Sequence, residues 1–201
     1  MCQYPLFETL AIIDGKIQNI EFHQQRLDYA MKNYFHSNQA VTFLSKFAIP
    51  TQFQQGLVRC RLDYNASDFE VNFYPYNSKK IQTFQCIYTQ DLDYQFKYAD
   101  RQKLDNLKNS NCDEIIIINN GFISDCTIGN LLFLKENQWY CSNHYLLKGT
   151  QLSSLISQQK VQLIEIKCED IFGFEKIMMI NALNPFDENR TVLISKDTIK
   201  I

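Results

Sequence analysis

The segment between residues 96 and 130 limits the possible folds of this chain more than any other stretch. Glu114 is followed by four consecutive isoleucines, and a run so rich in β-branched side chains predicts a strand. Asn119-Asn120-Gly121 supplies residues that adopt a left-handed backbone, and a second short strand pattern, Phe122–Ser124, comes directly after it. We therefore expect a hairpin, with Asp125 at the end of its second strand.

A lysine stands at the head of this segment. Residues 98–109 contain neither Gly nor Pro and place Leu104 and Leu107 three positions apart, which predicts a surface helix that begins after Lys97. Lys97 is thus expected at a loop-to-helix junction, with an aromatic residue on each side. Such an apolar wall favours the neutral amine that a reactive lysine needs.

The first part of the chain mixes strand and helix patterns. These patterns predict strands at residues 6–13, 16–20, 56–63 and 69–74 and helices at residues 21–34 and 39–47. The turn Asp14-Gly15 joins the first two strands, and Ile49-Pro50 ends the second helix. Arg26 lies on the first, amphipathic helix. Arg59 and Arg61 share one face of the third strand, so they are either substrate contacts or an exposed strand face.

A polar, proline-bearing stretch at residues 75–80 predicts the boundary between two domains, at residues 1–77 and 81–201. In the second domain the patterns predict further strands at residues 83–88, 131–134, 139–142, 161–166 and 177–180 and a helix at residues 150–159. The sequence therefore indicates an α+β protein with two domains.

Composition narrows the class of protein. A formal net charge of -2 in 201 residues gives no electrostatic basis for binding nucleic acid or an anionic membrane. Seven cysteines without a C-x-x-C pair suit neither a disulfide framework nor a zinc site, and the three histidines form no metal-ligand pattern. No apolar run approaches the roughly 20 residues of a membrane span, and the N-terminal residues lack the basic-then-apolar order that is typical of a signal peptide. We expect a cytoplasmic protein that acts on a small molecule without a metal.

Several motifs resemble those of the class IV aminotransferases. They are Phe7-Glu8-Thr9-Leu10, Asp14-Gly15-Lys16 and His23-Gln24-Gln25-Arg26-Leu27, then Lys97, Asn119-Asn120-Gly121, Asp125, Thr127, Asn130 and Phe133, and finally Leu147-Lys148-Gly149-Thr150. Arg101, four residues after Lys97, and the segment Ile180–Pro185 are similar to the aminodeoxychorismate lyase branch. The resemblance covers nearly the whole chain.

The resemblance implies pyridoxal-phosphate fold type IV, the fold of D-amino acid aminotransferases. It implies a shortened N-terminal domain with the phosphate-side and substrate arginines and a barrel-like C-terminal domain with a Schiff-base lysine. In this family pyridoxal 5'-phosphate lies in the cleft between the domains, and a homodimer partner completes the site. A cofactor of this kind supplies the electron sink, while the protein supplies binding and orientation.

The same resemblance assigns roles to individual residues. Lys97 is the Schiff-base lysine, and Asp125 is the acid that pairs with the pyridine nitrogen. Arg26 is the phosphate-binding arginine, in keeping with the bidentate geometry of a guanidinium. The remaining expected cofactor contacts are Thr150 and Gln151 at a predicted helix start, where backbone N–H groups attract phosphate, together with Asn181 and Ala182.

The sequence also departs from the family pattern and leaves the reaction open. Asp125 stands where the family usually has Glu, Leu152 replaces Arg, Ala182 replaces Ser or Thr, and Asp100 replaces Asn. Arg59, Arg61 and Arg101 are the candidates for binding substrate carboxylates. The leading expectation is 4-amino-4-deoxychorismate lyase, which gives 4-aminobenzoate and pyruvate for folate synthesis. A branched-chain or D-amino acid aminotransferase is the first alternative, and a non-catalytic pyridoxal-phosphate-binding homologue is the second.

Overall fold

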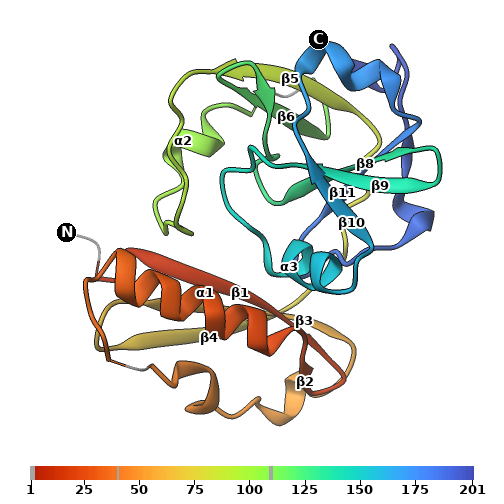
Figure 1. Ribbon diagram of the computed structural model, residues 1–201. Coiled ribbons are helices and arrows are strands. Elements are labelled where there is room, and N and C mark those ends of the chain that lie inside the picture. Colours follow the sequence, from red (N-terminus) through yellow and green to blue (C-terminus); the bar gives the residue numbers. More distant parts are fainter. Residues whose placement is uncertain (1–2, 40, 109–110) are drawn as a thin grey trace. The chain divides into compact units, whose positions relative to one another are not determined.

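The computed structural model describes residues 3–39, 41–108 and 111–201 and contains two compact units (Figure 1). Residues 1–78 and 96–100 form the first unit, and residues 79–95 and 101–201 form the second. Helices and strands occur in both, as expected of an α+β protein.

The first unit is a four-stranded antiparallel sheet in the order β2-β1-β3-β4. Its elements are β1 (Leu6–Ile13), β2 (Lys16–Ile17), α1 (Ile20–Asn33), η1 (Phe43–Ser45), η2 (Thr51–Phe53), β3 (Leu57–Tyr64) and β4 (Phe69–Pro75). Asp14 and Gly15 both have positive φ, at 47° and 77°, which is the backbone that a tight two-residue hairpin requires. The predicted N-terminal hairpin is therefore confirmed.

Helix α1 packs across one face of this sheet (Figure 1). Its buried residues Leu27, Ala30 and Met31 meet Leu10 of β1 and Leu62 of β3 in one apolar cluster. Side chains alternate across the pleat of a strand, so every second residue of β1 and β3 points to the helix. The intervening residues, which include the arginines of β3, point to the opposite face.

The predicted helix over residues 39–47 is wrong for the residues that the structure describes. Only the 3-10 turn η1 forms there, and Ala40 lies outside the described residues. Phe43 and Leu44 are buried in the core of the first unit, so this segment is fixed by its apolar side chains. Tertiary packing of this kind overrides a weak helical pattern.

Residues 96–100 are irregular, although the helix was predicted to begin directly after Lys97. Phe7 N donates to Lys97 O (2.9 Å) and Ala99 N donates to Pro5 O (2.8 Å). These bonds place residues 96–100 in the first unit, although we had expected Lys97 within the domain of residues 81–201. The helix itself is short, α2 (Gln102–Asp105), and the predicted end at Asn109 lies outside the described residues.

The second unit contains two sheets. Its elements are β5 (Phe84–Thr89), α2, β6 (Glu114–Asn119), β7 (Phe122–Ile123), β8 (Asn130–Lys135), β9 (Gln138–Ser142), α3 (Thr150–Ser157), β10 (Val161–Ile164), η3 (Cys168–Gly173), β11 (Lys176–Ile180), η4 (Glu188–Arg190), β12 (Val192–Leu193) and β13 (Ile199–Lys200). One sheet has the order β13-β5-β6-β7 and the other β10-β9-β8-β11-β12. The hairpin β6–β7 is confirmed, with Ile118 opposite Ile123 and positive φ at Asn120 and Gly121.

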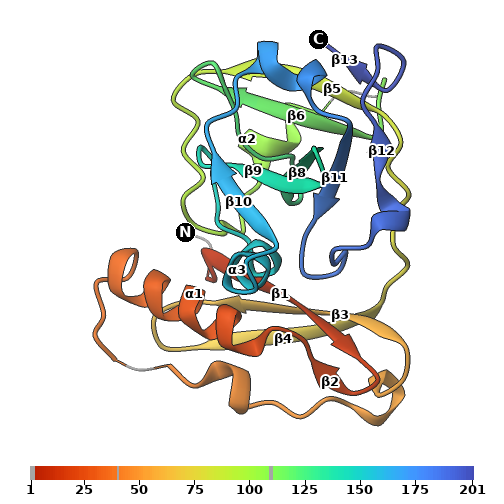
Figure 2. The same ribbon diagram turned by 45° about the vertical axis from the view of Figure 1, so that its right-hand side comes forward.

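The five-stranded sheet is the middle layer of the second unit (Figure 2). Ile116 of β6 and Phe133 of β8 belong to one apolar cluster, which fills the space between the two sheets. On its other face, Leu132 packs with Leu152 and Leu155 of α3. Strand β13, which pairs in parallel with β5, was not predicted.

The cysteines within the described ranges, at positions 60, 86, 112, 126, 141 and 168, are free thiols. Of the helices in the described part of the chain, none combines the length and the apolar character that crossing a bilayer requires.

Candidate active site

Lys97 is held by aromatic packing in the first unit. Its Nζ lies 4.7 Å from the centroid of the Phe7 ring, a distance typical of a cation–π contact. On either side of it, Phe96 and Tyr98 join an aromatic cluster with Tyr34, the residue that follows α1. The backbone of Lys97 is thus fixed by β1 and by its neighbours, while its side chain is partly exposed.

A buried polar cluster joins α1 to β1. Glu8 and His23 are fully buried, and His23 Nδ1 lies 2.7 Å from Glu8 Oε2. Arg26 donates from Nε to Glu8 Oε1 (2.8 Å) and from Nη2 to Glu8 Oε2 (2.6 Å), so the guanidinium holds the carboxylate in a bidentate pair. The edge of Arg26 that we expected to bind phosphate is therefore directed to Glu8.

The charges of this cluster follow from its burial. Burial alone raises the pKa of Glu8, but the charge of Arg26 and the hydrogen bonds from His23 and Arg26 outweigh it and lower that pKa to about 2. Burial also lowers the pKa of His23 below its usual value, although Glu8 opposes this shift. The cluster consequently holds an ionised Glu8, a charged Arg26 and a neutral His23 whose Nδ1 hydrogen points to the carboxylate.

The two arginines of β3 differ in their partners. Arg61 donates from Nε and Nη2 to Asp63 at 2.7 Å and 2.6 Å, and its Cζ lies 4.1 Å from the Phe7 ring centroid. The guanidinium of Arg59 lies over the ring of Tyr74, 5.4 Å from the centroid. Within the described residues, the buried Nε of Arg59 has no hydrogen-bond partner. A bound anion would therefore supply the acceptor that the Nε–H group of Arg59 lacks.

In the second unit, Asp125 and Asn130 are buried side by side. Asn130 Nδ2 donates to Asp125 Oδ1 (2.7 Å), and the backbone N–H groups of Leu146 and Leu147 both donate to Asp125 Oδ2 (3.0 Å each). Asn130 also accepts from Gly149 N at 3.0 Å. The predicted cofactor acid thus binds the loop that leads to α3.

Thr150 and Gln151 begin α3, as predicted, and both are buried. Gly149 is the N-cap residue and contributes no side-chain cap to the first turn. The early N–H groups of a helix have no partner within the helix and attract anions. Leu152, which replaces the family arginine, is fully buried in the core beneath the helix.

Asn181 forms the third part of this region. Its Oδ1 accepts from Leu183 N (3.0 Å) and Asn184 N (2.9 Å), and its Nδ2 donates to Ile128 O (3.0 Å). These bonds tie the turn that contains Ala182 to the residues next to Asp125. Asp125, Thr150 and Asn181 are therefore linked within one unit, although 56 positions separate the first from the last.

Arg101 binds the segment between Asp125 and Asn130. Its Nη2 donates to Thr127 O (2.7 Å) and lies 3.4 Å from Asp105 Oδ1, and its Nη1 lies 3.4 Å from Tyr94 Oη. Thr127 in turn donates from Oγ1 to the buried carboxylate of Glu114 (2.8 Å). The predicted substrate arginine is thus bound to the backbone of the residues that follow β7.

Sequence reasoning did not single out Glu8, His23, Glu114 or Asn130 as site residues, although the first, second and fourth stood within the quoted motifs. In the sequence, these residues could have been recognised as charged or amide side chains at positions of a strand or an amphipathic helix that face the core. Such residues are seldom fully buried unless they are paired, so their burial indicates a specific network.

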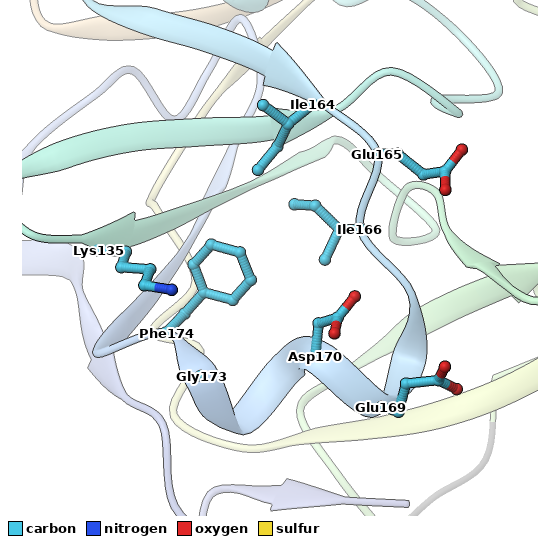
Figure 3. Close-up of a pocket in the computed structure, with 8 residues that line it drawn as sticks. All are labelled: Lys135, Ile164, Glu165, Ile166, Glu169, Asp170, Gly173 and Phe174. Atoms are coloured by element: carbon cyan, nitrogen blue, oxygen red, sulfur yellow. The ribbon is translucent and has the colours of Figure 1, made fainter.

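A separate open cavity of about 390 Å³ lies in the second unit (Figure 3). Its lining residues are Lys135, Ile164, Glu165, Ile166, Glu169, Asp170, Gly173 and Phe174. None of the predicted site residues lines it. We therefore assign the candidate site to the residues described above.

The comparisons with known proteins identify the family of this chain. The family model "Amino-transferase class IV" matches residues 96–186. An uncharacterized protein from Haemophilus influenzae is 42% identical over 185 residues, which span 90% of this chain and 98% of that protein. The chain belongs to the class IV aminotransferase family.

Two solved structures are similar to this chain in fold. A protein from Haemophilus somnus, named a "putative 4-amino-4-deoxychorismate lyase", has a TM-score of 0.85 and 38% identity, over 92% of this chain and all of that one. A hypothetical aminotransferase from Mycobacterium tuberculosis in its PLP-bound form has a TM-score of 0.72 and 14% identity, over 91% of this chain and 79% of that one. The second likeness shows the fold alone.

Proposed function

We propose that this protein is a pyridoxal-phosphate-dependent lyase that converts 4-amino-4-deoxychorismate to 4-aminobenzoate and pyruvate. The observation that carries the proposal is the similarity to the Haemophilus somnus protein, which extends over the full length of that chain. The lyase-like position of Arg101 and the segment Ile180–Pro185 support the same branch of the family.

The described residues offer a suitable environment for the phosphate group of this cofactor. Helix α3 begins at Thr150 without a side-chain cap, and its N-terminal dipole favours an anion there. We therefore assign the phosphate to Thr150 and Gln151. The phosphate contact that the family resemblance gives to Arg26 stays a prediction, because Nε and Nη2 of its guanidinium already donate to Glu8. Asn181 holds the turn of Ala182, the remaining proposed contact.

Lys97 is the residue that we assign to covalent attachment and then to proton transfer. When bound, pyridoxal phosphate supplies an electron sink for the carbon that loses a proton. The free amine of Lys97 would then be the base that takes the proton from the carbon that bears the substrate nitrogen. Its backbone bond to β1 and its contact with Phe7 restrict where that amine can move.

Arg59 is our choice for a substrate carboxylate. Arg61 already has a bidentate partner in Asp63, so an added carboxylate would compete with an existing ion pair. The Nε of Arg59 is buried and lacks an acceptor within the described residues, and a carboxylate would supply one. Orphaned buried donors of this kind are rare in folded proteins, and a bound ligand is one way in which they find an acceptor.

The test is a single-turnover experiment with the purified protein and pyridoxal phosphate. We expect 4-amino-4-deoxychorismate to yield pyruvate and 4-aminobenzoate with the original visible absorbance regained and no keto-acid acceptor required. Lys97→Ala should abolish both the visible band and the products. Lys103→Ala, on the exposed side of α2, is the matched control and should retain both.

The aminotransferase alternative makes a different prediction for the same experiment. An ordinary amino acid would then convert the cofactor to its amine form, and 2-oxoglutarate would restore it. That result, together with no pyruvate from 4-amino-4-deoxychorismate, would exclude the lyase. A visible band that persists in Lys97→Ala would remove this lysine from the proposed attachment site.

A further inference from the structure

We infer that Asp125 and Asn130 act as a positioning pair that fixes residues 146–149 and thereby the start of α3. The resemblance to the family assigned Asp125 to the ring nitrogen of the cofactor. The contacts within the second unit give its carboxylate another task. The consequence for phosphate binding rests on the proposed function, whereas the positioning itself does not.

The hydrogen bonds of the pair define this task. Asp125 Oδ2 accepts from Leu146 N and Leu147 N, and Asp125 Oδ1 accepts from Asn130 Nδ2. Asn130 Nδ2 also donates to Leu147 O (2.9 Å), and Asn130 Oδ1 accepts from Gly149 N (3.0 Å). Two side chains therefore bind four backbone groups of a loop that lies between β9 and α3.

The pair is buried and tightly packed, which makes its geometry specific. Asp125 and Asn130 are 5% and 3% exposed. A Cβ atom added at Gly149 would overlap Asn130 Oδ1, so only glycine permits the loop to approach this closely. Because Thr150 begins α3 directly after Gly149, any shift of the loop moves the N–H groups of the first helical turn.

The length of the side chain matters in this arrangement. Asp125 stands where the family usually has Glu, and its carboxylate lies one methylene closer to its own backbone. From that position it accepts hydrogen bonds from the N–H groups of two successive residues. A glutamate in the same place would displace the loop or lose these bonds.

After substitution of Asp125 by Asn, no orientation of the two amide side chains keeps all the hydrogen bonds of the pair. The new amide can keep its oxygen on Leu146 N and Leu147 N only by turning its own NH₂ group toward the Asn130 Nδ2 donor. A flip of Asn130 would relieve that contact but break its bonds to Leu147 O and Gly149 N. At least one buried polar group is left without a partner in either case.

The experiment measures amide hydrogen exchange in the cofactor-free protein, followed by a titration with pyridoxal phosphate. In Asp125→Asn we expect exchange at least tenfold faster at Leu146, Leu147 and Gly149, and a dissociation constant for pyridoxal phosphate at least tenfold higher. Asp113→Asn is the matched control. The three hydrogen bonds that Asp113 accepts all end on Oδ2, so a single amide oxygen can replace them.

Asp125→Glu provides a second variant if Asp125→Asn does not fold. It keeps the charge and restores the usual acid of the family, yet we expect it to speed exchange at the same three amides. Unchanged exchange in Asp125→Glu, with cofactor binding as tight as before or tighter, would overturn the inference in favour of a ring contact. Unchanged exchange in a folded Asp125→Asn would do the same.

The two proposals fail in different ways. If the unaltered protein binds no pyridoxal phosphate, the proposed function fails, while the exchange measurement still tests the positioning pair. Faster exchange with an unchanged affinity for pyridoxal phosphate would overturn the link between this pair and the phosphate at α3.

Discussion

Replacement of Glu8 by Gln should destabilise the first unit in a pH-dependent manner. The folded protein holds the pKa of Glu8 at about 2, against an ordinary value of 4.5. One pKa unit corresponds to about 1.4 kcal/mol, so this carboxylate contributes on the order of 3 kcal/mol to the free energy of unfolding at neutral pH. The neutral amide of the Glu8→Gln variant cannot carry the negative charge that Arg26 and His23 face.

The sign of the pH dependence follows from linkage. Because the pKa of Glu8 is lower in the folded state, the unfolded state binds more protons between pH 4.5 and pH 2, and stability falls as the pH falls through this interval. The Glu8→Gln variant has no such group. The difference in stability between the two proteins should therefore be about 3 kcal/mol at pH 7 and decrease toward zero near pH 2.

The assay is urea-induced unfolding at pH 7, 5, 4 and 2.5. The only tryptophan, Trp139, lies in the second unit, so amide exchange of β1 is the appropriate probe for this cluster. Glu70→Gln is the control, because Glu70 is exposed on β4 of the same sheet. A difference that stays constant from pH 7 to pH 2.5, or an equal loss in the control, would refute the reasoning.

Two further predictions concern packing and substrate contact. Gly129→Ala should destabilise the second unit by roughly 1–3 kcal/mol or more, because the added Cβ overlaps the backbone oxygen of Ile180. Gly173→Ala is the control and should have little effect, since nothing lies within 4 Å of its Cβ position, and thermal unfolding of both variants measures the difference. Arg59→Gln should raise KM for 4-amino-4-deoxychorismate at least tenfold, equivalent to about 1.4 kcal/mol, with the melting temperature retained. An equal or larger rise in KM for Arg61→Gln would instead make Arg61 the carboxylate residue.

Local sequence determined the strands and turns of this protein well. The isoleucine run of β6 and the turn Asn119-Asn120-Gly121 specify a hairpin by side-chain shape and backbone freedom alone, and the structure contains it. The start of α3 at Thr150 was likewise predictable, because a glycine precedes a run with helical periodicity. Family membership also follows from short motifs, since their order along the chain is a property of the sequence.

Contacts between residues far apart in the sequence determined the conformation around Lys97 and the partners of the buried polar side chains. Lys97 lies in an irregular segment because Pro5 and Phe7, about 90 residues earlier, offer backbone partners to residues 99 and 97, and no local pattern reports such partners. Glu8 and Arg26 form a buried ion pair only once α1 packs on the sheet. The task of Asp125 depends on loop 146–149, whose N–H groups the sequence cannot place. A side chain's chemistry can be named from its type, but its partner is chosen by the tertiary structure, which determines which polar groups are buried together.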